Sequence, residues 1–193
     1  MIPGAGDPED DLESGLRAVR EELADRMRER WQRDLPFEEL ISDRWERARR
    51  LGFGEGSSIY ESSYVYGDVR VGANTWIGPL TLLDGSGGLS IGDWCSISSG
   101  VHIYSHDTVA WAVSGGRVPA QRTPVVVGSN TYIGSQVVVA RGVTIGDHCV
   151  IGANAFVNRD IPPFSVAVGS PCRVVGRVVL AESGEVSLVY DDR

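Results

Sequence analysis

Residues 127–157 read VGSNTYIGSQVVVARGVTIGDHCVIGANAFV, and this stretch decides the fold. An aliphatic residue stands at every sixth position: Val127, Ile133, Val139, Ile145, Ile151 and Val157. An α-helix would spread a period of six over all its faces, whereas short strands joined by tight turns keep every sixth residue on one side. The stretch therefore predicts short β-strands in a coiling chain.

The same period continues upstream. Its aliphatic positions are Ile59, Val65, Val71, Ile77, Leu83 and then, after a two-residue slip in a Gly-rich segment, Ile91, Ile97 and Ile103. Four positions after most of these aliphatic residues stands a small or β-branched one, such as Thr75 or Cys149. Repeats this short cannot each bury a hydrophobic face, so successive coils must stack on one core. With three repeats per triangular coil, about 14 repeats give nearly five coils at the strand spacing of about 4.8 Å.

Residues 57–177 resemble the hexapeptide-repeat acyltransferases, and in particular the maltose- and galactoside-type sugar O-acetyltransferases and those of polysaccharide biosynthesis. The motifs that carry the resemblance are Ile91-Gly92-Asp93, Gly100-Val101-His102-Ile103-Tyr104 with the following His106, Gly142-Val143-Thr144-Ile145-Gly146-Asp147 and Gly169-Ser170-Pro171-Cys172-Arg173. The resemblance implies a mainly β fold, a left-handed parallel β-helix. It also implies a homotrimer with active sites between subunits, and acetyl-CoA as acyl donor.

Three segments are expected. Residues 1–55 are expected to form a helical segment that begins with an amphipathic helix over Pro8–Gln32. A second helix is expected over Pro36–Leu51, with Asp34 as its cap and Gly52 at its end. These helices either cap the open end of the solenoid or cover the acceptor pocket. Residues 56–177 form the β-helix with an extruded loop at 107–124, and 178–193 form a C-terminal tail.

His106 stands where the repeat breaks, because regular spacing is lost directly after it until about Val125. A solenoid accommodates an insertion only where it projects outward, and such loops commonly carry function. With an ordinary pKa near 6.5, a histidine can take a proton at neutral pH. His106 is therefore the predicted catalytic base, although an ordinary solvated histidine is the alternative. Asp107 occupies a core position of the repeat, where it would orient the imidazole or pin the loop.

Three residues are expected at the acceptor site. Asp84 resembles an acidic residue that contacts acceptor hydroxyls in the sugar acetyltransferases, but it could equally open the Gly-rich turn that follows it. The same resemblance adds Tyr104 and, from the loop, Trp111. An Asn that those enzymes place several residues before the acid has no match here, where Ile77-Gly78-Pro79 stands. The acceptor's identity is therefore open.

The donor site is expected in the coils after the loop, also by resemblance. Tyr132 and Ser135 match residues beside the pantetheine arm, and Gly152 and Ala153 offer backbone groups to its amides. Asn158, Arg159 and Arg173 match polar and basic positions near the nucleotide, where a guanidinium can bind phosphate through two hydrogen bonds. The sequence predicts direct transfer to a sugar hydroxyl without an acyl-enzyme, because nothing resembles an activated Ser or Cys nucleophile.

Composition excludes other classes. A net charge of −8 argues against a nucleic-acid binder. No apolar stretch is long enough to span a bilayer, and the acidic N-terminus lacks the cationic start of a signal peptide, so a cytoplasmic location is expected.

Cys95 and Cys149 are expected in the core, and no metal is expected. The histidines at 102, 106 and 148 do not match the spacing of the γ-type carbonic anhydrases. An amino-sugar or amine N-acetyltransferase and an inactive trimeric scaffold remain the alternatives.

Overall fold

The computed structural model describes residues 8–191. The chain divides between Asp43 and Arg44 into two compact units, a helical one and the solenoid. Residues 1–7 of the expected helical segment and 192–193 of the expected tail lie outside the described residues.

The first unit holds helix α1 (Pro8–Trp31), which contacts the short helix α2 (Phe37–Ile41). The prediction of one helix over Pro36–Leu51 is wrong, because Ser42 after α2 has extended backbone (φ −105°, ψ 142°) and a separate helix, α3 (Arg44–Arg50), follows. Ser and Asp side chains compete for backbone hydrogen bonds and disfavour helix interiors, which explains a break at Ser42-Asp43. Asp34 is not the cap either, since α2 begins after Pro36 without a side-chain cap.

The second unit starts with α3, which packs against strand β1 (Ser58–Ile59). Ala48 and Phe53 are buried members of the solenoid core, and a guanidinium nitrogen of Arg47 donates to the carbonyl of Ser63 at 2.7 Å. Helix α3 therefore covers the first coil, whose strand edges would otherwise be open.

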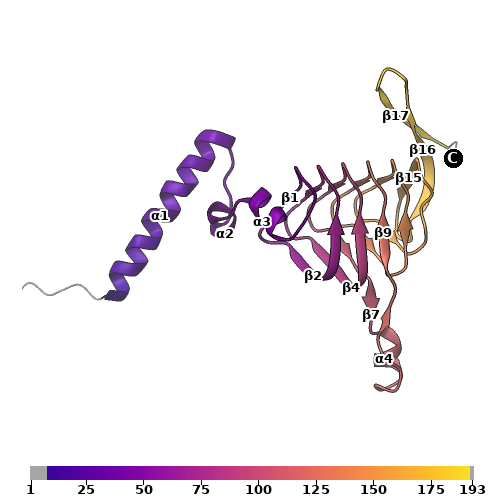
Figure 1. Cartoon of the computed structure of the whole chain (residues 1–193), viewed down its shortest axis with the longest axis horizontal. Helices are drawn as coiled ribbons and strands as arrows, with labels where there is room; N and C mark the ends of the chain where they lie inside the picture. Colours follow the sequence, from indigo (N-terminus) through magenta and orange to yellow (C-terminus); the bar gives the residue numbers. More distant parts are fainter. Residues whose placement is uncertain (1–7, 192–193) are drawn as a thin grey trace, which may run out of the picture. The chain divides into compact units, whose positions relative to one another are not determined.

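One sheet of the solenoid begins with parallel strands and ends in a hairpin. Its parallel strands are β1, β3 (Trp76–Ile77), β5 (Ser96–Ile97), β10 (Tyr132–Ile133), β13 (Val150–Ile151) and β15 (Ser165–Val168). The antiparallel strands β16 (Arg173–Leu180) and β17 (Val186–Tyr190) follow, so the expected tail begins inside a strand. Figure 1 shows this hairpin at the end of the stacked coils.

The other sheet folds around a corner and supplies two faces of the solenoid. Strands β2 (Tyr64–Val71) and β4 (Leu82–Ile91) run through the corner and belong to both faces. One face continues with β6 (His102–Ile103), β11 (Val138–Val139) and β14 (Phe156–Val157), and the other with β9 (Val125–Val127) and β12 (Thr144–Ile145). The register of β2 against β4 shifts between Gly67 and Val69, where β4 accommodates the two extra residues seen as a slip in the repeat.

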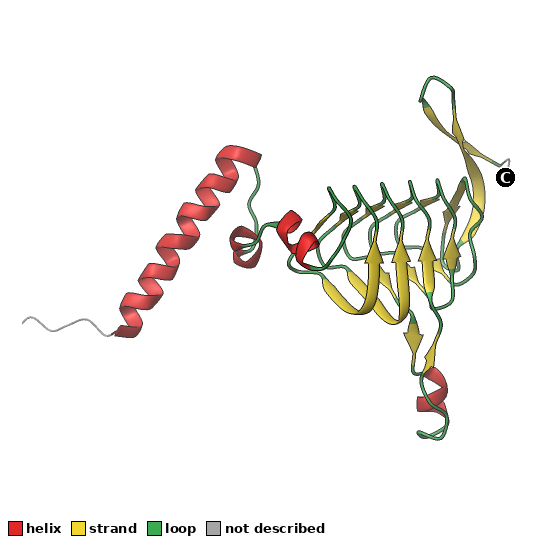
Figure 2. Ribbon diagram, viewed as in Figure 1, coloured by secondary structure: helices red, strands yellow, loops and turns green. Residues whose placement is uncertain are grey.

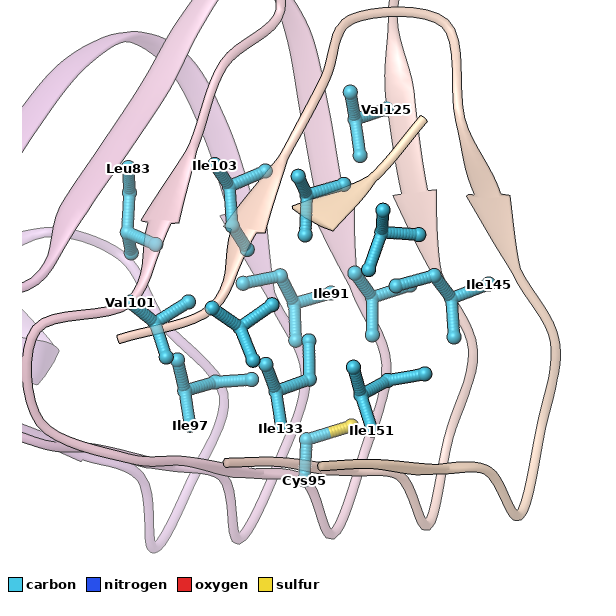
Figure 3. Close-up of a cluster of buried hydrophobic side chains, with 14 of the residues drawn as sticks. Leu83, Ile91, Cys95, Ile97, Val101, Ile103, Val125, Ile133, Ile145 and Ile151 are labelled. Carbon is cyan, nitrogen blue, oxygen red and sulfur yellow. The ribbon is translucent and has the colours of Figure 1, made fainter. Parts of the chain in front are cut away.

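The repeat positions fill the interior, as Figure 3 shows. The aliphatic residues of successive coils stack in rows and are almost completely buried: Ile59, Ile77, Leu83, Ile97, Ile103, Ile133, Ile145 and Ile151. Small polar residues between the rows bond from coil to coil. The Thr131 hydroxyl donates to the carbonyl of Gly146 at 3.0 Å and accepts the N–H of Cys149 at 3.2 Å. Cys95 and Cys149 are buried, and burial raises the pKa of both thiols, which suits a packing role.

The loop after His106 leaves the solenoid at the corner that β2 and β4 cross. Strand β7 (His106–Asp107) pairs antiparallel with β8 (Gln121–Arg122), and helix α4 (Val109–Val113) lies beyond them. Figure 2 shows this loop projecting from the coils. Asp107 is therefore not a core residue, which corrects the expectation from the repeat, because the chain has already turned outward there.

Candidate active site

The site is built on one buried carboxylate at this corner. Asp84 is only 1% exposed, and its Oδ2 lies 2.5 Å from Nδ1 of His106. The same oxygen accepts the backbone N–H of Ser105 at 2.9 Å and of His106 at 3.2 Å. These bonds fix both the backbone and the ring of His106 against Asp84.

The Gly-rich segment after Asp84 makes room for this contact. The other carboxylate oxygen accepts the N–H of Ser86 at 3.0 Å, and the N–H of Gly87 donates to the Ser105 hydroxyl at 2.7 Å. A Cβ on Gly87 would lie 2.4 Å from the carbonyl oxygen of Ser105, so a larger residue there would push the two coils apart. Asp84 therefore opens the turn and holds the histidine at the same time.

The electrostatics keep Asp84 ionised. Burial by itself would raise the pKa of this carboxyl, but hydrogen bonds from Ser86, from His106 and from the Ser105 backbone outweigh it and lower the pKa to about 2. An ionised Asp84 only accepts hydrogen bonds, so Nδ1 of His106 carries the hydrogen, and in the neutral imidazole the lone pair is on Nε2. The His106 side chain is 35% exposed. The arrangement can therefore take a proton from a bound molecule.

Asp107 and Arg141 hold the base of the loop. The carboxylate of Asp107 pairs with the guanidinium of Arg141, and its other oxygen accepts the N–H of Val109 at 3.0 Å. Arg141 also contacts Gln121 and donates to the Thr123 hydroxyl at 3.2 Å. Of the two roles considered for Asp107, this geometry favours pinning the loop, since Asp84 already orients the imidazole.

The other predicted acceptor residues, Tyr104 and Trp111, lie outside the hydrogen-bonded pair of Asp84 and His106, which we call the dyad. Tyr104 follows β6 two residues before His106, and its hydroxyl lies 3.3 Å from Nδ1 of His102. Trp111 is exposed on α4, farther out on the loop. Asp84 lies beneath His106 rather than on open surface, so its placement differs from the expected direct contact with acceptor hydroxyls.

The predicted donor residues fall into two groups at two corners. Tyr132 is on β10, with Ser135 in the next turn; Gly152 and Ala153 occupy the equivalent turn one coil later. Asn158 and Arg159 follow β14. They lie at the same corner as the loop, two coils after it. The face of β6, β11 and β14 separates the groups, so one ligand that touches both must cross it.

Arg173 opens strand β16, beside Val168 of β15. Arg159 and Arg173 are both exposed, and within residues 8–191 neither forms an ion pair. Asp160, which could have paired with them, instead accepts the N–H of Thr144 at 2.7 Å. Both guanidinium groups are therefore accessible to an anion.

The two remaining histidines are outside the dyad. His148 lies at a corner with φ of +55°, and its ring stacks on Phe164 with centroids 4.7 Å apart. His102 is half-buried on β6. Across the described residues, no group of His, Cys, Asp and Glu is placed to hold a metal ion. Nor does any helix there have the length and apolarity to cross a membrane.

Two residues of the site, Ser105 and Arg141, were not predicted from the sequence. Ser105 is completely buried between Asp84 and Gly87, and Arg141 anchors the loop from the next coil. No local pattern marks either of them, because each acts on a residue in another coil.

Comparisons with known proteins agree with this architecture. Residues 124–159 match the family model of the bacterial transferase hexapeptide (six repeats). This match and the relatives below show that the chain is similar to the hexapeptide-repeat acyltransferases.

Among its relatives is the galactoside O-acetyltransferase of Escherichia coli (strain K12), 34% identical over 128 residues, which are 56% of this chain and 63% of that protein. The curated relatives compared are covered over less than two thirds of their own length. A solved galactoside acetyltransferase in complex with coenzyme A is 25% identical, with a TM-score of 0.63 over 92% of this chain and 84% of that one. The maltose O-acetyltransferase from Clostridium difficile 630 is 29% identical, with a TM-score of 0.55 over 84% of this chain and 87% of that one. The prediction of a left-handed parallel β-helix is therefore confirmed.

Proposed function

We propose that this chain is an acetyl-CoA-dependent O-acetyltransferase that acts on a hydroxyl of a sugar or glycan precursor. The observation that carries the proposal is the buried Asp84 bonded to Nδ1 of a partly exposed His106, in a protein whose relatives are named sugar acetyltransferases. Because acetyl-CoA is a metabolite of the cell interior, we also propose that the protein works in the cytoplasm.

His106 is the general base in this reaction. Its Nε2 takes the proton of the acceptor hydroxyl as the oxygen attacks the thioester carbonyl carbon. The C–S bond then breaks, and the thiolate of CoA leaves with the proton that the imidazolium returns. Asp84 does not touch the acceptor. It holds the ring in one tautomer and stabilises the positive charge that forms on it.

One face of the solenoid connects the two substrates in this proposal. Strands β2 and β4 carry its first coils, β6 leads into His106, and β11 and β14 carry its last coils. The donor residues flank the last coils of this face, which leaves the first coils for the acceptor. A product analysis tests the whole proposal: acetyl-CoA and a sugar should give free CoA and an O-acetylated sugar.

We expect replacement of Arg159 or Arg173 by alanine to raise the KM for acetyl-CoA about tenfold or more, with little change in the acceptor KM. A charge-assisted phosphate contact contributes about 1.5–3 kcal/mol, and about 1.4 kcal/mol corresponds to a factor of ten. Steady-state kinetics with each substrate varied in turn measures this. Arg177, exposed on the same strand as Arg173, provides the matched control. A change below about twofold in both variants would place the nucleotide elsewhere.

We expect the protein to be a homotrimer with shared active sites. The family resemblance implies this assembly, and the solenoid exposes large apolar side chains at Trp76 and Trp94. Light scattering should give about three times the monomer mass of 20.8 kDa. An active monomer at the assay concentration would rule out both the trimer and the shared sites.

A further inference from the structure

Two tyrosines lie side by side on the outer surface of the first coils. Val65 occupies an inward repeat position, so its neighbours Tyr64 and Tyr66 point outward from β2. Their ring centroids are 6.1 Å apart, and the two residues are 60% and 48% exposed. They therefore form a pair of accessible aromatic rings on a rigid strand.

This tyrosine pair is adjacent to the proposed base. Tyr66 is in direct register with Asp84 on the neighbouring strand, about 4.8 Å away at the backbone. The carboxylate of Asp84 in turn holds His106 at 2.5 Å. A molecule resting on the tyrosine rings thus lies beside the imidazole.

A second pair of rings continues the same surface two coils farther on. Tyr64 is in register with Leu82, and Leu82 with His102, so these three outward residues form one row. The rings of His102 and Tyr104 meet edge to face, with centroids 6.0 Å apart. The half-buried Leu82 lies between the two pairs. The first coils therefore present an aromatic and aliphatic surface next to the dyad.

The chemistry of this surface matches one kind of acceptor. A pyranose ring has a face of C–H groups, which packs well against tyrosine rings, and a rim of hydroxyls that stays free to meet a base. A small alcohol or amine would cover little of a ring pair this wide. The tyrosine hydroxyls add donors and acceptors at the edge.

We propose that Tyr64 and Tyr66 form the platform on which the pyranose ring of the acceptor stacks beside His106. This inference rests on the proposed acetyl transfer to a sugar, and it assigns acceptor specificity to residues outside the expected set of Asp84, Tyr104 and Trp111.

The direct test measures binding without acetyl-CoA. Methyl β-D-galactopyranoside is titrated into the full-length protein and followed by ligand-observed NMR. We expect Tyr64→Ala and Tyr66→Ala each to weaken binding about tenfold. The phenylalanine variants should bind nearly as well as wild type, because they keep the ring. Tyr190→Ala, which removes an equally exposed tyrosine from β17, is the matched control and should not change binding.

Two outcomes overturn the platform: no binding of the pyranoside to wild type, or unchanged binding to both correctly folded alanine variants. Kinetics then separate this inference from the proposed function. If the wild type releases CoA with the galactoside but the acceptor KM is unchanged in both alanine variants, only the platform fails. If the pyranoside binds through the tyrosines but no acetyl transfer occurs, the proposed function fails and the platform stands as a sugar-binding site.

Discussion

Replacing His106 by alanine is expected to lower kcat by about 10²–10⁴-fold, the usual loss on removal of a general base. The imidazole is the partly exposed member of the dyad, and the bond from Nδ1 to Asp84 leaves Nε2 as the basic nitrogen of the neutral ring. Because the proposed donor residues lie on other coils, the affinity for acetyl-CoA should stay close to that of wild type. Steady-state turnover and a CoA titration of the variant measure the two effects.

His148→Ala is the matched control for this experiment. That ring stacks on Phe164 and has no part in the dyad, so its removal should leave kcat nearly unchanged. If the His106 variant kept more than about a third of the wild-type kcat, the assignment of the base would be wrong.

Replacing Asp84 by asparagine is expected to lower kcat by a comparable factor, on the order of 10²–10⁴. An amide nitrogen in place of Oδ2 would donate to Nδ1 and leave the hydrogen on Nε2, where the lone pair is needed. The acetyl-CoA KM should change little. A variant with nearly full kcat would show that the imidazole does not depend on this carboxylate.

Asp84 also makes stability depend on pH. Its folded-state pKa of about 2 lies below the ordinary value of 3.8, so the ionised carboxylate stabilises the fold above that ordinary value. This contribution, on the order of 2 kcal/mol, is lost as the pH falls through the folded-state pKa. Urea unfolding should therefore show a gap in free energy between wild type and Asp84→Asn at pH 7 that narrows between about pH 5 and pH 2. A gap that stayed constant with pH would contradict the buried ionised state.

Much of the fold could be predicted because the repeat indicates which residues are buried. Each sixth aliphatic residue, such as Ile133 or Ile151, points into one narrow core, and the loss of this spacing after His106 marks the place where the chain leaves the solenoid. The helix break at Ser42 was not predicted, since two polar residues within an otherwise helical pattern gave only a weak local signal.

The pairing of Asp84 with His106 could not be predicted from spacing. The two residues are 22 positions apart, and they meet at the corner where β4 accommodates two extra residues and the loop begins. The repeat predicts which residues face inward, but the contacts at a widened corner depend on the register between neighbouring coils. The same limit applies to Ser105 and Arg141.

Acceptor-dependent CoA release by the purified protein is the decisive test of acetyl transfer through His106. Wild type and His106→Ala are incubated with acetyl-CoA and, in turn, a galactoside, maltose, sugar nucleotides and amino sugars, with a thiol reagent to detect CoA and mass spectrometry to identify the product. We expect release that requires a sugar hydroxyl, an O-acetylated product, and a rate at least about 100-fold lower for the variant. No release with any of these acceptors, or equal rates for the two proteins, would contradict it.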